Sequence, residues 1–319
     1  MKKLLVTALL TALSSIASAW EPSKPIITLI GNSPGSGNEI SFRMVQTELE
    51  KKSNVRFVIV NKPGVSELVA ANYFATQPAD GHTVLVAACN DIYIAPEVWY
   101  PTTAKFNAMD FVPVATFGKA PYAFWANIDS KVNTPQELID AIKRNDRKIN
   151  FGVGGLGQQL AVEYLIENQK IPPGHVQSIV YKGSGQAMVD MMGGHVEFAV
   201  VALSVGWPNM PSGKLKLIGV ASDKKLAGLE KYPLMKDTVA GLTIGTCWSL
   251  LLPPNTPQDV QSWYRDNFVP ILNTKEILTQ FEKNLIQPTP SEHTPAGVKE
   301  SMTNLRRVWI PVARRVTPN

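Results

Sequence analysis

The chain has 319 residues, a formal net charge of +5 and 45% hydrophobic residues. A charge excess this small does not indicate nucleic-acid binding, so nucleic acid is not expected among its partners. Beyond residue 19, no apolar run reaches the roughly 18 residues that a membrane-spanning helix needs. A chain of this length corresponds to one or two domains of about 150 residues.

The first 19 residues have the pattern of a secretory signal peptide. Lys2 and Lys3 form a short positive start, residues 4–13 are apolar apart from two threonines, and Ala17-Ser18-Ala19 is a small-x-small cleavage site. We therefore expect export to the periplasm, with cleavage after Ala19. Loss of the two lysines leaves 29 Lys and Arg against 26 Asp and Glu, a net charge of about +3.

The two cysteines leave the redox state open. Cys89 and Cys247 can form one disulfide in an exported protein. A chain of about 300 residues buries enough core without a bridge, so two free buried thiols are the default expectation. Neither the cysteines nor the four histidines have the spacing of metal ligands, and we expect no metal and no cofactor.

The mature chain begins with an alternation of apolar strands and helical patterns. Strands are expected at 26–30, 55–60 and 83–88, with one helix running on from residue 40 and another over 66–77. Near-continuous apolar strands that alternate with helices favour a parallel sheet covered on both faces.

The same order returns in the second half of the chain. After strand candidates at 111–117 and 122–127, Thr134-Pro135-Gln136-Glu137 has the composition of a helix N-terminus. A second βαβαβ series then follows, with glycine-rich turns where strands lead into helices. Its strands are expected at 149–153, 176–181 and 196–203, and its helices at 158–168 and 186–192.

These patterns predict an α/β protein with two lobes, each a mainly parallel sheet flanked by helices. Residues 20–120 are expected to form the first part of lobe 1 and residues 121–222 lobe 2. Residues 223–319 are expected to form a return segment and C-terminal helices that pack mainly on lobe 1. Each of these boundaries carries a margin of about 15 residues.

Four turns with glycine or polar residues follow strands of the two lobes. Ligands of open α/β sheets bind outside the carboxyl ends of the strands, where helix N-termini favour anions. We therefore expect a ligand cleft between the lobes. The four turns comprise residues 33–39, 89–91, 154–158 and 182–186.

Motifs for other chemistries are incomplete. Residues 152–157 match G-x-G-x-x-G, but the next strand ends in Val180-Tyr181-Lys182 without the acidic residue of a dinucleotide site. No serine lies in a G-x-S-x-G elbow, and no paired carboxylates are recognisable, so catalytic residues are not expected. Lys182 is either a counter-charge at the cleft or a solvated residue, and both interpretations stay open.

Several short motifs occur in a fixed order along nearly the whole mature chain. They are Trp20–Ile26, Ser33–Glu39, Val60–Gly64, Pro78–Thr83, Tyr181–Gly185, Met192–Glu197 and Trp248–Pro257. Together they resemble the solute-binding proteins of the tripartite tricarboxylate transporters, the Bug family. After its opening, the family has A-P-G-G-G-T-D, E-N-R-P-G, P-D-G-Y-T, Y-K-G-S-G, G-G-Q-V-D and W-x-x-L-L-x-P-x-x-T-P at the corresponding places.

The resemblance implies a type II periplasmic-binding-protein fold whose lobes close on a small carboxylate. It implies a non-enzymatic monomer that delivers this ligand to a membrane permease. Members of the family bind the carboxylate through the first βα turn and the equivalent turn of the second lobe. The ligand-binding residues expected here are Ser33, Pro34, Gly35, Ser36, Gly37, Asn38, Glu39, Asn90, Asp91, Gly154, Gly155, Leu156, Gly157, Gln158, Lys182, Ser184 and Ala202.

Three departures from the family pattern bear on the ligand. Gly64-Val65-Ser66-Glu67 replaces G-A-G-G, and residues 153–159 lose the usual hydroxyls and histidine. Asn38 and Glu39 replace Thr and Asp. Glu39 is expected in the first turn of its helix, where a carboxylate is favoured. If it faced the cleft instead, it would suit a ligand with an amino group or a hydroxyl.

Two other functions remain open for such a sequence. An exported α/β enzyme could use the same cleft to act on a small carboxylate, and a ligand-dependent sensor for a membrane kinase would share both fold and ligand. The sequence does not identify the carboxylate.

Overall fold

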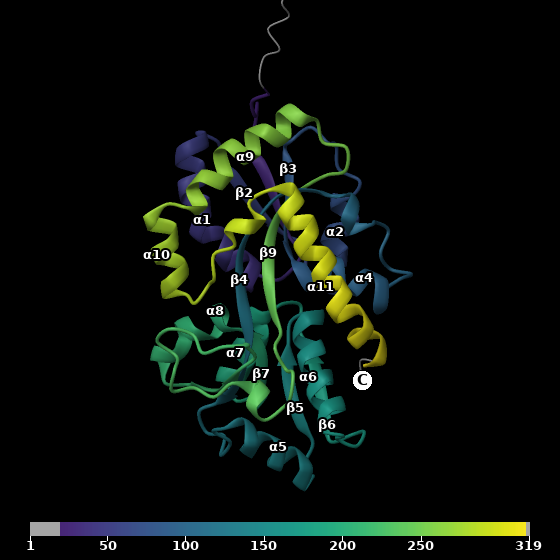
Figure 1. Cartoon of the computed structure of the whole chain (residues 1–319), viewed down its shortest axis with the longest axis vertical. Coiled ribbons are helices and arrows are strands. Elements are labelled where there is room, and N and C mark those ends of the chain that lie inside the picture. The colour runs from purple at the N-terminus through teal and green to yellow at the C-terminus, as the bar shows by residue number, and fades with distance from the viewer. Residues whose placement is uncertain (1–19, 317–319) are drawn as a thin grey trace, which may run out of the picture.

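The computed structural model describes residues 20–316, so the predicted signal peptide lies outside the described residues. It shows two lobes, one above the other, joined by long strands at the waist (Figure 1). Within the described part, no helix is long and apolar enough to cross a membrane.

The first lobe is built on a sheet with the strand order β2-β1-β3-β9-β4. β1 pairs in parallel with β2 and β3, and β9 then runs antiparallel to both β3 and β4. This sheet is therefore mixed, with the predicted parallel βαβαβ unit at one side. Its elements are β1 (Ile26–Ile30), α1 (Gly37–Ser53), β2 (Phe57–Asn61), α2 (Leu68–Phe74), β3 (Thr83–Ala88), α3 (Cys89–Tyr93), α4 (Ala95–Val98), η1 (Ala108–Asp110) and β9 (Gly245–Leu252).

The second lobe repeats this plan. β5 pairs in parallel with β6 and β7, and β4 runs antiparallel to β7 and β8. As predicted, α5 begins at Thr134, whose Oγ1 accepts a hydrogen bond from the Glu137 N–H (3.2 Å). The elements are α5 (Pro135–Arg144), β5 (Ile149–Val153), α6 (Leu156–Asn168), β6 (Val176–Val180), α7 (Ser184–Met192), β7 (Phe198–Ala202), α8 (Leu203–Gly206), η2 (Trp207–Ser212), β8 (Leu215–Val220) and η3 (Met235–Asp237).

One strand, β4 (Val112–Asn127), belongs to both sheets. It pairs with β9 as far as Pro121 and with β7 from Tyr122 onward. The sequence predicted two separate strands here, at 111–117 and 122–127. The intervening residues stay extended because β9 supplies a pairing partner for them, which local sequence does not reveal.

The C-terminal helices pack on the first lobe and cross the waist. α9 (Gln258–Leu272) and α10 (Lys275–Lys283) pack against α1, and η4 (Pro290–Glu292) precedes α11 (Pro295–Arg315). α11 contacts α3 and α4, and near its end Trp309 stacks edge-on against Tyr164 of α6. It thus reaches both lobes (Figure 1). The residue boundaries of the lobes stay a prediction.

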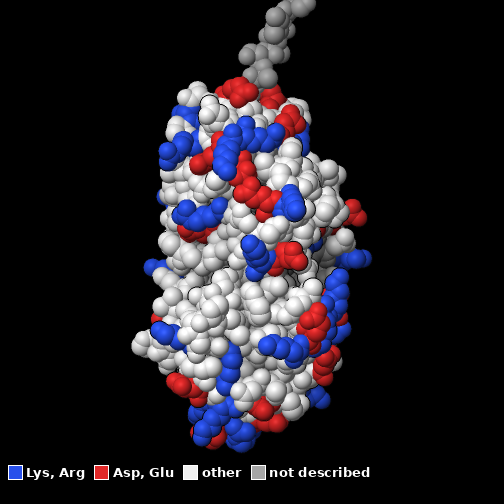
Figure 2. All heavy atoms as spheres, turned by 90° about the vertical axis from the view of Figure 1, so that its left-hand side faces the viewer, with Lys and Arg blue, Asp and Glu red and all other residues white. Residues whose placement is uncertain are grey.

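Charged side chains of both signs are interspersed over the face shown in Figure 2. No large patch of a single sign is visible on that face.

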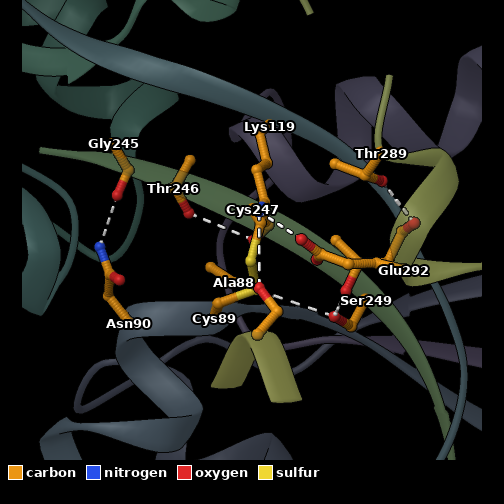
Figure 3. The surroundings of a disulfide bond; sticks show 12 residues. Ala88, Cys89, Asn90, Lys119, Gly245, Thr246, Cys247, Ser249, Thr289 and Glu292 are labelled. Carbon is orange, nitrogen blue, oxygen red and sulfur yellow. Dashed lines mark hydrogen bonds and ion pairs between the residues drawn. A yellow bond between two sulfur atoms is a disulfide. The ribbon is translucent and has the colours of Figure 1, made fainter. Parts of the chain in front are cut away.

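The expectation of two free thiols is wrong. Cys89 and Cys247 form a disulfide across 158 residues of sequence (Figure 3). The reason lies in the register of β3 and β9: Ala88 faces Trp248, so the next residues along, Cys89 and Cys247, are neighbours. A register between strands so far apart in the chain is set by tertiary structure and cannot be read from cysteine spacing.

We expect the Cys89→Ser, Cys247→Ser double variant to lose stability, because the bridge closes a loop of 158 residues. The chain-entropy estimate for such a loop is about 5 kcal/mol, and measured losses are typically about 2–5 kcal/mol. Urea unfolding followed by circular dichroism checks this. A reducing agent should destabilise the wild type and leave the variant unchanged, and equal midpoints for the two proteins would contradict the prediction.

Candidate functional site

A small polar cavity lies where the two lobes meet. It leaves about 20 Å³ of free space, close to the room of a single water molecule. Lobe 1 contributes residues from the β1–α1 turn, the end of β3 and the start of β9, and lobe 2 contributes the N-termini of α6 and α7. The lining residues are Asn32, Ser36, Gly37, Asn38, Ala88, Asp91, Tyr122, Gly154, Gln158, Ser184, Ala202, Thr246 and Trp248.

The first glycine-rich turn owes its shape to two glycines. Gly35 has φ +79°, a conformation that favours glycine. Gly37 begins α1 against the indole of Trp248, where an added Cβ would lie 2.9 Å from Cζ2. This close packing brings the N-terminus of α1 to the cavity wall.

In the corresponding turn of lobe 2, two backbone N–H groups already donate hydrogen bonds to side chains of the protein. The Gly154 N–H donates to Gln158 Oε1 (2.6 Å), and the Leu156 N–H donates to Asp91 Oδ1 (2.6 Å). Asp91 belongs to lobe 1, so its carboxylate occupies the position at the α6 N-terminus that an anionic ligand would take.

The two lobes are in direct contact at their glycine turns. The Ser33 N–H donates to the Lys182 carbonyl (2.9 Å), and Gly185 of α7 lies against Gly35. A Cβ on Gly185 would come within 2.8 Å of the Gly35 carbonyl oxygen. A ligand can therefore reach the cavity only when the lobes separate.

One buried carboxyl group, Asp91, lines the cavity, and a second, Glu67, accepts hydrogen bonds from Asn32 and Asn38 of the cavity wall. Burial raises the pKa of both. Desolvation is the main cause at Glu67, where the charge of Asp91 adds to it and holds the pKa well above the usual range. Desolvation raises the pKa of Asp91 to about 7, against the lowering effect of hydrogen bonds from the Leu156 N–H and Ser66.

Of the three charged side chains predicted for the site, Asp91 lines the cavity, whereas Glu39 and Lys182 lie outside its lining. The Glu39 carboxylate pairs with Arg43 (2.8 Å) and accepts from Asn61 Nδ2 (3.0 Å). This is the expected position in the first turn of α1, and Glu39 does not face the cavity. The Lys182 side chain is exposed, which agrees with its interpretation as a solvated residue.

The predicted ligand-binding residues fall into four groups. Ser36, Gly37, Asn38, Asp91, Gly154, Gln158, Ser184 and Ala202 line the cavity. Pro34 and Gly35 line a groove beside it, and Asn90 lines a pocket of about 410 Å³ on the hinge side. There, Asn90 Nδ2 donates to the Gly245 carbonyl (2.8 Å; Figure 3). Ser33, Glu39, Gly155, Leu156, Gly157 and Lys182 line none of these spaces.

Sequence reasoning missed five of the lining residues, Asn32, Ala88, Tyr122, Thr246 and Trp248, and it also missed Glu67 beside the cavity. Tyr122 and Thr246 lie on strands β4 and β9 at the waist, and no motif indicated that these strands reach the ligand cleft. Glu67 was visible only as a departure from the family pattern. Its carboxyl reaches Asn32 and Asn38 because residues 65–67 adopt left-handed backbone conformations.

Two α/β lobes joined at a waist, with glycine-rich turns meeting at an enclosed polar cavity, define the class of two-lobed solute-binding proteins. Residues 41–293 of the chain match the model of a protein family described as "Tripartite tricarboxylate transporter family receptor". The chain belongs to this family, as the ordered motifs predicted. The family is one of receptors, and on that ground the chain is a binding protein and not an enzyme.

Relatives support the same assignment. Protein BugT of Bordetella pertussis is 22% identical over 92% of this chain and 89% of the relative. The solved structure "R. palustris Rpa4515 with adipate" matches with a TM-score of 0.86 at 21% identity, over 93% of this chain and 99% of that one. "MatC (Rpa3494) from Rhodopseudomonas palustris with bound malate" matches with a TM-score of 0.84 at 19% identity, over 92% and 99%. These likenesses confirm the predicted fold.

We expect Gly185→Ala to hold the lobes apart. The new Cβ would meet the Gly35 backbone in the closed form, whereas in an open form alanine favours the helix by up to about 1 kcal/mol. Small-angle scattering should give a larger radius of gyration than for the wild type, and the melting temperature should not fall. Gly193→Ala, at the end of α7 and away from lobe 1, is the matched control. If Gly185→Ala had the same radius of gyration as the wild type, both with and without ligand, this result would contradict the interlobe contact.

The buried acids should make stability depend on pH. Their pKa values are raised in the folded state, so the folded protein binds more protons than the unfolded chain, and stability falls as pH rises through about 7. Glu67→Gln should therefore stabilise the protein at pH 8 relative to the wild type and give little or no gain at pH 4. Urea unfolding at both pH values checks this.

Glu300→Gln, at an exposed acid, is the control and should leave the pH dependence unchanged. If Glu67→Gln were less stable than the wild type at pH 8, the prediction would be wrong. The Glu67 carboxyl would then not carry the desolvation cost that we expect.

Proposed function

We propose that this chain is a periplasmic receptor that captures a small carboxylate-containing molecule between its lobes and delivers it to the membrane permease of a tripartite tricarboxylate transporter. The observation that carries the proposal is the meeting of the β1–α1 and β5–α6 turns at one enclosed polar cavity. Each turn leads into a helix N-terminus, where anions bind favourably. Export follows from the predicted signal peptide, removed after Ala19.

Family membership supports the transporter as partner, and the relatives support a carboxylate. The titles of two structures with the same fold name adipate and malate as bound molecules. In this chain, the waist strands β4 and β9 allow the lobes to move apart around residues 121 and 245, where β4 changes partner. A receptor that opens and closes in this way presents a different surface to a permease when loaded.

A thermal-shift screen of small mono- and dicarboxylates and amino acids tests the proposal. A ligand that binds only the folded state raises its stability by RT ln(1 + [L]/Kd), about 2.7 kcal/mol at a concentration of 100 Kd. We expect one compound to raise the melting temperature and to be recovered unchanged after incubation with the protein. Conversion of the compound into a product would favour an enzyme, and the absence of any stabilising carboxylate would overturn the receptor proposal.

A further inference from the structure

Carboxyl groups of the chain itself occupy the hydrogen-bond donors around the cavity. In lobe 1, Asn32 Nδ2, Asn38 Nδ2 (3.0 Å) and the Ala88 N–H (3.2 Å) all donate to the Glu67 carboxyl. In lobe 2, the Leu156 N–H at the start of α6 donates to Asp91. Some of the donors with which each lobe would hold a ligand carboxylate are therefore already taken.

The backbone that positions Glu67 is strained. Val65, Ser66 and Glu67 have φ values of +45°, +48° and +66°, and none of them is glycine. Left-handed backbone is unfavourable for an ordinary L-residue, because Cβ comes too close to the following carbonyl oxygen. The family pattern has glycine where Glu67 stands, so in this chain a carboxyl fills space that a glycine leaves open. Strain of this kind is commonly found where a side chain has a functional position.

The groups that remain for a ligand include unsatisfied acceptors. Asn38 lines the cavity and is 1% exposed, and its Oδ1 has no hydrogen-bond partner among the described residues. Asp91 also lines the cavity, and its carboxylate lies against Gly155. The described residues that line the cavity include no Lys, Arg or His.

This distribution of charge is unfavourable for a dianion. A carboxylate buried without a cation costs several kcal/mol, and a like charge nearby adds to that cost. A dicarboxylate would bring two negative charges next to Asp91, and the described residues that line the cavity supply no basic side chain to balance them. An ammonium group would instead supply the missing positive charge and donate to the free acceptors.

We propose that this receptor selects a ligand that carries an ammonium group, with Asp91 as its counter-carboxylate and Asn38 Oδ1 as a second acceptor, and that it rejects dicarboxylates. The proposal rests on the receptor function given above and names the chemistry of its ligand. When the lobes separate, Asp91 loses the Leu156 N–H as partner. An ammonium can then bind Asp91 of lobe 1, and a single carboxylate on the same molecule can take the freed N–H of lobe 2.

Three matched series of compounds with two to six carbons test this: amino acids, both α and ω, linear dicarboxylates and linear diamines. Isothermal titration calorimetry and thermal shift at about 10 mM detect even millimolar affinities. We expect an amino acid to bind at least tenfold more tightly than the dicarboxylate of equal length. Diamines that bind as tightly as the amino acids would identify the ammonium as the whole determinant and would remove the carboxylate from the receptor proposal.

Conservative variants test whether the Asp91 carboxylate binds the ammonium group of the ligand. Asp91→Asn can still accept the Leu156 N–H but lacks the charge, so it should weaken binding of the amino acid at least tenfold. Asp237→Asn, at an exposed acid of lobe 2, is the matched control and should bind as the wild type does.

The sign of the pH dependence provides an independent readout. The titratable groups close enough to interact electrostatically with Asp91 are Glu67, before α2, and Tyr122, on β4, and the Leu156 N–H and Ser66 donate hydrogen bonds to its carboxylate. Since the pKa of Asp91 is raised to about 7, an ammonium that prefers its ionised form binds with release of a proton, and its affinity rises from pH 6 to pH 8. The affinity for a dicarboxylate would instead fall from pH 6 to pH 8.

Two results would overturn the proposal. If a dicarboxylate bound the wild type and Asp91→Asn equally well, ammonium selection would be wrong, but the receptor function would stand. If no ammonium compound bound in any series, ammonium selection would be wrong, and if no carboxylate bound either, the receptor function would fail with it.

Discussion

The structure depends on one continuous strand that serves two sheets. β4 pairs with β9 in the first lobe and with β7 and β8 in the second, and it changes partner between Pro121 and Tyr122. Since the backbone hydrogen bonds of β4 are used on both sides of that point, β4 joins the two sheets in a fixed order. The glycine turns face one another as a consequence, and the cavity forms between them.

The disulfide strengthens the same region. It joins β9 to the first residue of α3, the short helix that carries Asn90 and Asp91. A helix of five residues has little stability of its own, so the covalent link and the packing against β9 hold these two side chains at the waist. Figure 3 shows how closely the bridge lies to the hydrogen bond between Asn90 and the Gly245 carbonyl.

Two carboxyl groups of the protein, Asp91 and Glu67, distinguish this cleft from a simple anion site at helix N-termini. Helix N-termini favour an anion, yet the chain meets part of that preference internally through Asp91 at α6. Glu67 similarly uses the donors of Asn32 and Asn38. The dipoles are thus partly neutralised before any ligand arrives.

The sequence by itself determined the family, the two βαβαβ units and most of the cavity wall, because apolar periodicity and glycine-rich turns are local signals. It also indicated correctly that Glu39 belongs to the first turn of a helix. Tertiary structure decided the disulfide, the continuity of β4 and the position of Glu67 next to Asp91. Each of these depends on contacts between segments far apart in the chain, and such contacts leave no local pattern in the sequence.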